Sequence, residues 1–371
     1  MSNKKPIELS PPHFNTAFNE KMLMEEPASI LAAFEEEVRT YVGRPHAVAV
    51  HSGTSAIHLA LKVLGIGKGD IVLCQSLTYA ATAFPIMYEG AQPVFIDSEP
   101  DTGNMDPELL EKAILELAEK GQKPGAILLV HLYGMPAKMK EIIEIADHHG
   151  IPVVEDAAEA LGAEYHNTRC GNFGKLSILS FNSNKVITSG GGGMLLTAER
   201  ELAEKALYFA TQAKDEGTVM NHREVGYNYR MNHVNAALGA SQFTKLNERI
   251  RKRREIFEFY KQSLGSLPGI SFLSEHPQTC SSRWLTTLFI DPSTSGGVTR
   301  SQVQEALTKE NIESRPVWKP MHLQPVFKNC PAYINGVSER LFTQGLCLPS
   351  GSNLSPHNLE RISSAIKNVF S

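Results

Sequence analysis

The sequence predicts an α/β fold with a mostly parallel sheet, followed by a smaller C-terminal α+β domain. The chain of 371 residues is 42% hydrophobic and 20% charged, which suits a globular protein with one large and one smaller domain. From about Ala47 to Leu196, short apolar runs alternate with segments of helical periodicity. This alternation is typical of βαβ units, whose strands are buried on both faces.

The expected elements follow one another in a regular order. HAVAVHSG leads into the helical TSAIHLALKVLGIG, and DIVLCQ is followed by TAFPIMYEG and PVFID. The helix PELLEKAILELAEKG precedes AILLVHLYG, and KMKEIIEIADHHG precedes IPVVEDAAEALG. Each of these helices ends at a glycine, where a left-handed cap costs little.

The pattern changes past Gly226. We expect one long polar helix over residues 232–265, followed by shorter mixed elements up to Ser371. The boundary is predicted near residue 246, with a large domain over 1–245 and a small domain over 246–371.

Composition excludes several classes of function. A net charge of -4 and a pI near 6.4 offer no basic field for nucleic acid, and the cluster from Arg249 to Arg254 is expected to be a helix face. Five scattered cysteines without a C-x-x-C spacing suggest neither a disulfide framework nor a zinc site, so no metal is expected. No segment has the pattern of a signal peptide or a membrane span, so the expected location is the cytoplasm.

Lys185 lies in the segment SFNSNKVITSGGGGM, between a small polar run and four glycines. A phosphate-binding P-loop requires glycines before the lysine and Ser or Thr directly after it, so this segment does not fit. Two interpretations remain open from the segment alone. Lys185 is either a solvated loop residue or a reactive amine that forms a Schiff base with a carbonyl cofactor.

Polar residues follow several of the expected strands, and ligands of open α/β sheets gather at the carboxyl ends of strands. His51 to Ser55 open a helix, where N–H groups favour a phosphate, although Ser and Thr are also common N-caps. Tyr79 follows another strand and offers either an aromatic platform or ordinary packing. Asp156 ends a strand that is expected to be buried on both faces.

A buried carboxylate is costly unless a cation pairs with it, and a protonated pyridine nitrogen is such a partner. Enzymes that use pyridoxal 5'-phosphate (PLP) need this arrangement, because the carboxylate keeps the ring nitrogen protonated and the ring an electron sink. Asp156 followed by the strand LSILSF and then by Lys185 is therefore a much more specific pattern than either residue alone.

Over nearly its whole length the chain resembles the DegT/DnrJ/EryC1 family of sugar-nucleotide aminotransferases, PLP enzymes of the aspartate-aminotransferase fold (fold type I). The motifs that carry the resemblance, in order along the chain, are FEEEVRTYVGRPHAVAVHSGTSAIHLAL, VHLYG, VVEDAAEALGA, SFNSNKVITSGGGGM, GYNYRMNHVNAALG and LCLPSG. CQSLTYAATAFPIMYEGAQPVFIDSEPDTGNMDP, SRWLTTLFID and NIESRPVWKPMHLQPVF are most similar to the C4 transaminases of the UDP-N-acetylbacillosamine pathway.

The resemblance implies a role for each matching residue. Lys185 would bind the cofactor covalently and act as the catalytic acid and base, and Asp156 would pair with the pyridinium nitrogen. The phosphate of the cofactor would be bound by four residues, Gly53, Thr54, Ser55 and Ser180. Tyr79 would stack on the cofactor ring, and Glu159 would also bind the cofactor. Asn228 would reach the phosphate from the second subunit of a homodimer. The implied substrate-binding residues are Asn182, Trp318, Lys319 and His322.

Three positions depart from the commonest family pattern. Glu159 stands where glutamine is frequent, Asn182 where histidine is frequent, and Gly191 where glutamate is frequent. These choices are similar to those of the bacillosamine branch, so they refine the subfamily.

The resemblance implies transamination at C4 of a UDP-linked 4-keto-6-deoxy-N-acetylhexosamine. L-Glutamate would be the amino donor, 2-oxoglutarate would leave, and the cofactor would pass through its amino form, PMP. A GDP- or dTDP-linked keto sugar, or amination at C3, is the alternative within the fold. A PLP-binding regulator without turnover is the alternative from another class, whereas a dehydratase of this fold would lack the lysine.

Overall fold

The computed structural model describes residues 4–13 and 26–371. Within them, the large sheet has the strand order β1-β9-β8-β5-β4-β2-β3-β14. Its strands are β1 (His46–Val50), β2 (Ile71–Gln75), β3 (Gln92–Ile96), β4 (Ala126–Val130), β5 (Val153–Asp156), β8 (Leu176–Ser180), β9 (Gly193–Thr197) and β14 (Ala332–Tyr333). The mostly parallel sheet that the sequence predicts is confirmed.

One strand breaks the parallel pattern. β9 is antiparallel to both of its neighbours, β8 and β1, so β1 points in the same direction as the parallel strands β8, β5, β4, β2 and β3. The carboxyl ends of β1, β2, β5 and β8 therefore meet at one edge of the sheet.

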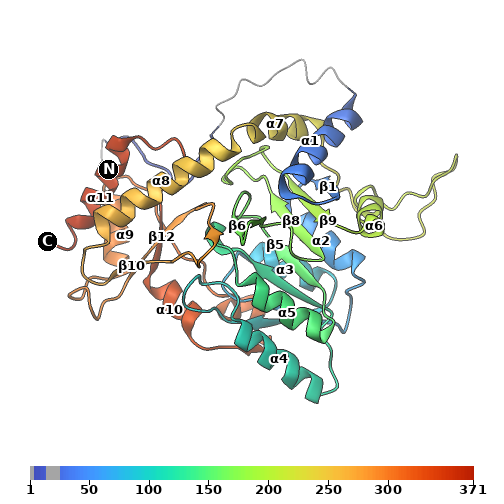
Figure 1. Cartoon of the computed structure of the whole chain (residues 1–371), viewed down its shortest axis with the longest axis horizontal. Coiled ribbons are helices and arrows are strands. Elements are labelled where there is room, and N and C mark those ends of the chain that lie inside the picture. The colour runs from blue at the N-terminus through green and yellow to red at the C-terminus, as the bar shows by residue number, and fades with distance from the viewer. Residues whose placement is uncertain (1–3, 14–25) are drawn as a thin grey trace.

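Helices cover both faces of this sheet (Figure 1). α2, α3 and α6 share one buried cluster with the strands, and α1, α4, α5 and α7 contribute to the clusters of the other face. Side chains alternate accordingly, since Val72 and Cys74 of β2 face the first cluster and Leu73 faces the other. These helices are α1 (Pro27–Val42), α2 (Gly53–Val63), α3 (Ala80–Tyr88), α4 (Pro107–Glu119), α5 (Met139–His149), α6 (Arg200–Ala210) and α7 (His233–Phe243).

Glycine ends the helices as the sequence predicts. The caps Gly43 of α1 and Gly150 of α5 have φ of 90° and 61°, and Gly65, Gly90 and Gly121 adopt positive φ one residue after the caps of α2, α3 and α4. Only a residue without Cβ takes this left-handed conformation cheaply.

A second, antiparallel sheet lies toward the C-terminus, with the order β10-β12-β15-β13. It packs against α8, α9 and α11 around a separate buried cluster that includes Tyr260, Leu288 and Ile362. The elements are α8 (Leu246–Leu264), β10 (Ile270–Phe272), β12 (Thr286–Ile290), α9 (Arg300–Lys309), β13 (Arg315–Pro316), α10 (Val337–Gln344), β15 (Gly345–Leu348) and α11 (Pro356–Lys367).

Two segments cross the boundary expected near residue 246. Ile7 forms a bridge with Ile312, and β14 returns to the large sheet beside β3. The division into 1–245 and 246–371 stays a prediction. The remaining elements are the three-stranded sheet of β6 (Glu164–Tyr165), β7 (Thr168–Arg169) and β11 (Thr279–Cys280), and the 3-10 turns η2 (Leu132–Gly134), η3 (Met321–Leu323) and η4 (Pro325–Phe327).

The single long helix expected over 232–265 is wrong. The structure divides it into α7 and α8, which run at an angle to one another (Figure 1). At the break the Thr244 hydroxyl donates to the Ser241 carbonyl, and the Lys245 N–H bonds three residues back, to Gln242. A hydroxyl that takes a backbone carbonyl competes with the helical bonding pattern.

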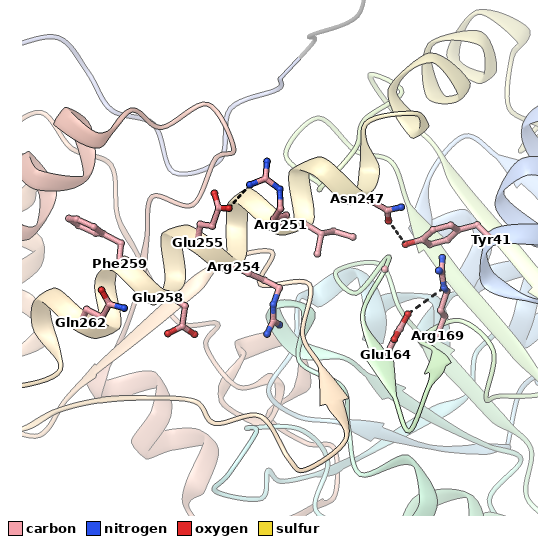
Figure 2. A pocket seen from close by; sticks show the side chains of 12 residues that line it. Tyr41, Glu164, Arg169, Asn247, Arg251, Arg254, Glu255, Glu258, Phe259 and Gln262 are labelled. Carbon is pink, nitrogen blue, oxygen red and sulfur yellow. Dashed lines mark hydrogen bonds and ion pairs between the residues drawn. The ribbon is translucent and has the colours of Figure 1, made fainter.

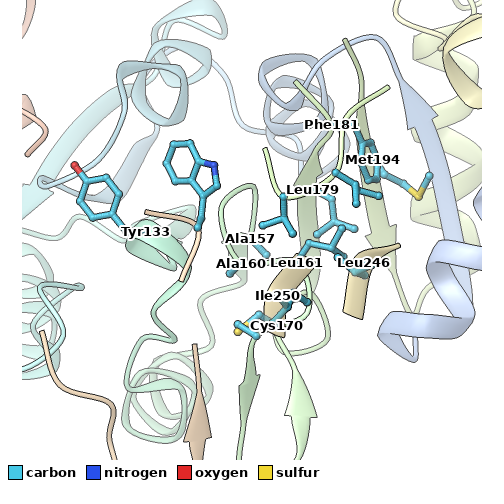
Figure 3. Close-up of a cluster of buried hydrophobic side chains, with 14 of the residues drawn as sticks. Tyr133, Ala157, Ala160, Leu161, Cys170, Leu179, Phe181, Met194, Leu246 and Ile250 are labelled. Atoms are coloured by element: carbon cyan, nitrogen blue, oxygen red, sulfur yellow. The ribbon is translucent and has the colours of Figure 1, made fainter. Parts of the chain in front are cut away.

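Side chains from both parts of the chain share one core. Figure 3 shows Leu179 of β8 and Ala157 after β5 near Leu246 and Ile250 of α8, within one buried cluster. Among the described residues, no helix is both long and apolar enough to cross a membrane.

Candidate active site

A cavity of about 430 Å³ opens at the carboxyl edge of the large sheet. It brings together nine of the residues predicted from the sequence, which come from five separate segments of the chain. They are Gly53, Thr54, Tyr79, Asp156, Glu159, Ser180, Asn182, Lys185 and Trp318. The strand ends therefore meet as the predicted topology requires.

Lys185 is not a freely solvated residue. Its side chain is 13% exposed, and its Nζ lies 3.7 Å from Oε1 of Glu159. On another side, the Nζ is 4.1 Å from the ring centroid of Trp284. The amine thus lies inside the cavity beside a carboxyl group and an aromatic face.

Asp156 ends β5 and directs its carboxyl into the same cavity. Its Oδ2 accepts a hydrogen bond of 2.8 Å from the Thr82 hydroxyl, and its Oδ1 accepts one of 3.1 Å from the Ala158 N–H. Burial raises the pKa of Asp156, and these two donors and the charge of Lys185 oppose that rise. A bound cation at this position would favour the ionised carboxylate further.

Glu159 is also buried, at 6% exposure. Burial raises the pKa of its carboxyl, while Lys185 and the N–H of Tyr133 lower it. The Tyr133 N–H donates to Oε2 at 2.7 Å, which leaves Oε1 to face the lysine.

The N-terminus of α2 forms one wall of the cavity. Ser52 caps the helix by accepting the Ser55 N–H at 3.1 Å. The first N–H groups of a helix have no intrahelical partner, and with the helix dipole they favour an anion. A Cβ at Gly53 would lie 3.2 Å from the Ser180 Cβ, so backbone here passes close to a predicted phosphate residue.

Aromatic side chains also line the cavity. Tyr79 is 56% exposed, and its ring lies 5.1 Å from that of Trp318. Neither ring is covered as a core residue is, which leaves a face of each for a ligand.

Four predicted residues do not line this cavity. The Ser55 hydroxyl turns away to pair with Ser52 and His51. Both ring nitrogens of His322 are taken, by Ser76 at 2.7 Å and Glu339 at 3.2 Å. The other two, Lys319 and Asn228, are exposed outside the cavity of this subunit.

The sequence analysis missed several residues that shape the site. Thr82 orients Asp156, Trp284 covers Lys185, and Tyr133 supplies the N–H that holds Glu159. Thr82 lies three residues after Tyr79, on the first turn of α3, a spacing that places both near the same strand end. Trp284 lies in the motif SRWLTTLFID and Tyr133 in the motif VHLYG. Nothing in the neighbouring sequence indicates that either side chain contacts the site.

A second hollow of about 600 Å³ lies along α8, beside β6 and β7 (Figure 2). Its charged side chains largely pair with one another, as Arg251 does with Glu255 and Arg169 does with Glu164. It contains none of the residues predicted to be functional.

The residues of the first cavity fit PLP. A helix N-terminus with close backbone suits its phosphate, the buried Asp156 carboxylate suits its ring nitrogen, and Lys185 offers an amine for its aldehyde. Fold and site together define the class, that of a PLP-dependent transferase with its site at the carboxyl ends of the strands.

Comparison with known proteins supports the assignment to the PLP-dependent transferases. Residues 15–367 match the DegT/DnrJ/EryC1/StrS aminotransferase family. EpsN of Bacillus subtilis (strain 168), which carries the name of a pyridoxal phosphate-dependent aminotransferase, is 44% identical over 99% of this chain and 96% of its own. GDP-perosamine synthase of Caulobacter vibrioides is 36% identical over 92% of this chain and 90% of its own.

A crystal structure of DesV from S. venezuelae has a TM-score of 0.83 and 32% identity, and the match covers 92% of this chain and 89% of DesV. The chain belongs to the DegT/DnrJ/EryC1/StrS aminotransferase family. It is therefore a PLP-dependent sugar aminotransferase.

Proposed function

We propose that this enzyme transfers the amino group of L-glutamate to C4 of a UDP-linked 4-keto-6-deoxy-N-acetylhexosamine. The products are a UDP-4-amino-4,6-dideoxy-N-acetylhexosamine and 2-oxoglutarate. The observation that carries the transamination is the cavity shared by the Lys185 amine, the buried Asp156 carboxylate and the N-terminus of α2.

This geometry supports the following roles for the protein groups. PLP, when bound, supplies the electron sink, and its PMP form carries the amino group between the two half-reactions. Lys185 is the acid and base that moves a proton to and from the reacting carbon. Asp156, oriented by Thr82, holds the cofactor's ring nitrogen protonated.

The cofactor phosphate is assigned to the N-terminus of α2. Gly53, Thr54 and Ser180 line the cavity there, and Ser55 supports the turn through Ser52 and His51. Tyr79 would contact the face of the cofactor ring, and Glu159, whose Oε1 faces Lys185, would complete the cofactor-binding set.

The nucleotide sugar is assigned to the part of the cavity that Trp318 and Asn182 line, next to which Lys319 is exposed. Trp318 can cover a ring, and Lys319 can meet a diphosphate as a point charge. Ser76 and Glu339 occupy both ring nitrogens of His322. His322 is therefore assigned only an indirect role at the substrate, through the residues that it contacts.

Two nucleotides compete as carriers of the sugar. The similarity of NIESRPVWKPMHLQPVF and CQSLTYAATAFPIMYEG to the bacillosamine branch supports UDP. The 36% identity to a GDP-perosamine synthase supports a GDP-linked 4-keto sugar as the second candidate. Both candidates place the new amine at C4, and neither requires a change in the roles of Lys185 and Asp156.

We also propose a homodimer that works in the cytoplasm. Asn228 is exposed and lies outside the cavity of its own subunit, where its backbone forms a bridge with Thr211 directly after α6. This placement supports a role for Asn228 at the phosphate of a second subunit.

Product analysis tests the proposal. The purified PLP enzyme is offered L-glutamate with a UDP-4-keto-6-deoxy-N-acetylhexosamine or with a GDP-4-keto-6-deoxyhexose, and products are identified by NMR. We expect amination at C4 and a higher kcat/KM for the UDP sugar. Equal or better turnover of the GDP sugar would replace UDP by GDP, and binding without any amino transfer would indicate a regulator.

Lys185→Ala is the control for the chemistry. It is expected to fold and to retain PLP without the visible absorbance of lysine-bound cofactor. Its turnover should fall by more than about 10²- to 10⁴-fold, because acid-base catalysis and the covalent role are both lost. Turnover and absorbance like those of the wild type would refute the role of Lys185.

A further inference from the structure

The chain contains two tryptophans, Trp284 and Trp318, and both line the cavity that holds Lys185. Their rings stack on Tyr133, with centroids 6.1 Å away for Trp284 and 6.0 Å away for Trp318 and interplanar angles of 19° and 20°. Tyr79 lies 5.1 Å beyond Trp318. These four side chains form an aromatic row whose inner end is Trp284.

Trp284 contacts the lysine and the backbone next to it. The Lys185 Nζ lies 4.1 Å from the indole centroid, where the negative face of the ring attracts a cation. The indole Nε1 donates a hydrogen bond of 2.7 Å to the carbonyl of Asn184, the residue directly before the lysine. One side chain therefore constrains both ends of Lys185.

Trp284 is itself buried and held by several contacts. It is 2% exposed, it stacks on Tyr133, and its own carbonyl accepts a hydrogen bond from the buried Arg253 of α8. The Ser10 hydroxyl donates to the same Asn184 carbonyl at 2.9 Å, which ties the loop to the N-terminal segment as well.

The opposite side of the amine is also defined. Glu159 Oε1 lies 3.7 Å from Nζ, while the Tyr133 N–H holds Oε2 at 2.7 Å. Tyr133 has φ of 53°, a left-handed conformation that non-glycine residues adopt at a cost. The charged groups that face Lys185 are Glu159 and Asp156.

We propose that Trp284 is a positioning residue for Lys185. Its ring face and its N–H confine the amine to one side of the cavity, so that the proton reaches the reacting carbon from one direction. This inference deepens the proposed function and rests on Lys185 being the reacting lysine. It assigns a role to Trp284, a side chain that carries no reacting group of its own.

Two variants of Trp284 separate the contacts. Trp284→Leu removes the ring face and the N–H, whereas Trp284→Phe keeps an aromatic face and loses only the N–H. We expect Trp284→Leu to lower kcat about 10- to 100-fold, as for displacement of a catalytic group by about 1 Å, with KM for L-glutamate nearly unchanged. The kcat of Trp284→Phe should lie between that of Trp284→Leu and that of the wild type.

A second readout does not depend on turnover. In the cofactor-free protein, lysines are methylated with formaldehyde and borohydride, and the rate at each site is followed by peptide mass spectrometry. Lys185 should react slowly in the wild type. In Trp284→Leu its rate should rise toward that of the exposed Lys112 and Lys140, whose side chains are 62% and 69% exposed.

Trp318→Phe is the matched control, because it changes the aromatic row without touching Lys185. It should leave the methylation rate of Lys185 unchanged. A wild-type kcat together with a wild-type methylation rate in Trp284→Leu would overturn the proposal. Failure of the proposed function looks different, since the wild type itself would then form no amino sugar while the methylation rates still depended on Trp284.

Discussion

The two carboxylates at the end of β5 are neighbours in sequence but have opposite environments. Successive side chains of a strand point to opposite sides, so Glu155 faces the interior and Asp156 faces the cavity. Glu155 accepts hydrogen bonds from the His131 ring, the Ser177 hydroxyl and three backbone N–H groups. Asp156 has two protein donors, which leaves capacity for a cationic ligand.

Their pKa shifts follow from these contacts. Burial favours the neutral form of Glu155, but the His131 hydrogen bond and the N–H groups of Gly171 and Phe173 outweigh it and lower its pKa to about 2. Burial dominates at Asp156 and raises its pKa. Glu155 therefore stabilises the fold, and Asp156 is the carboxyl that we propose to pair with the cofactor.

Glu155→Gln tests the structural role of this residue. A carboxyl with a folded pKa of about 2 and a model value of 4.5 contributes about 3 kcal/mol, which is fully present above pH 4.5 and is lost as the pH falls through about 2. The variant should have a lower free energy of unfolding at neutral pH and a flatter decline below pH 4.5. Urea unfolding at a series of pH values measures both.

The control is Glu204→Gln, at an exposed pair with Arg200. It should change the free energy of unfolding by less than about 0.5 kcal/mol. If Glu155→Gln followed the same pH curve as the wild type, the network around Glu155 would not be the source of its low pKa.

Among the elements, α2 and α9 begin with similar side-chain caps but have different surroundings. Ser52 caps α2 at the edge of the cavity. Thr299 caps α9 beside the second sheet, where its side chain and that of Gln302 form a capping box. The two caps allow helix stability to be separated from cofactor binding.

We expect Ser52→Ala and Thr299→Ala each to lower the free energy of unfolding by about 1 kcal/mol. Only Ser52→Ala should also raise the Kd for PLP, because it loosens the turn whose N–H groups we propose to bind the phosphate. Denaturant titration and PLP titration of the cofactor-free proteins measure the two effects. An unchanged PLP affinity in Ser52→Ala would place the phosphate elsewhere.

α8 packs against both parts of the molecule, because its residues belong to a buried cluster of the large sheet and to the cluster of the second sheet. The predicted helix face from Arg249 to Arg254 is partly buried, and Arg249 donates to the Val186 carbonyl while Arg253 donates to the Trp284 carbonyl. The loop that carries Lys185 is thus supported by α8, a helix that also packs against the second sheet.

At the scale of the whole molecule, the candidate site depends on residues far apart in the chain, from Gly53 to Trp318. The proposed homodimer extends this dependence to a second subunit through Asn228. A closed two-fold dimer would contain two equivalent shared sites.

Subunit mixing tests the shared site. We expect the Lys185→Ala and Asn228→Asp variants each to have low activity when expressed alone. Asn228→Asp should be impaired because a carboxylate repels the cofactor phosphate. Co-expression should restore part of the activity, since one site of a mixed dimer then receives both wild-type residues. Light scattering should show the dimer.

Lys185→Ala with Asp156→Asn is the matching pair. Both residues line the cavity of the same subunit, so each site of a mixed dimer keeps one defect and no activity should return. An active monomer, or equal behaviour of the two pairs, would refute the shared site and make Asn228 structural.

Three features could be predicted from the sequence alone: the parallel sheet, the glycine caps, and the presence of Asp156 and Lys185 in one cavity. They could be predicted because periodicity, caps and strand ends are local patterns. The sequence did not show the break between α7 and α8, which depends on a side-chain bond of Thr244. Only the tertiary structure placed Trp284 against Lys185, Tyr133 against Glu159, and the His322 ring between Ser76 and Glu339. These contacts join segments that are distant along the chain, and packing decides them because no local propensity encodes which distant side chain fills a given space.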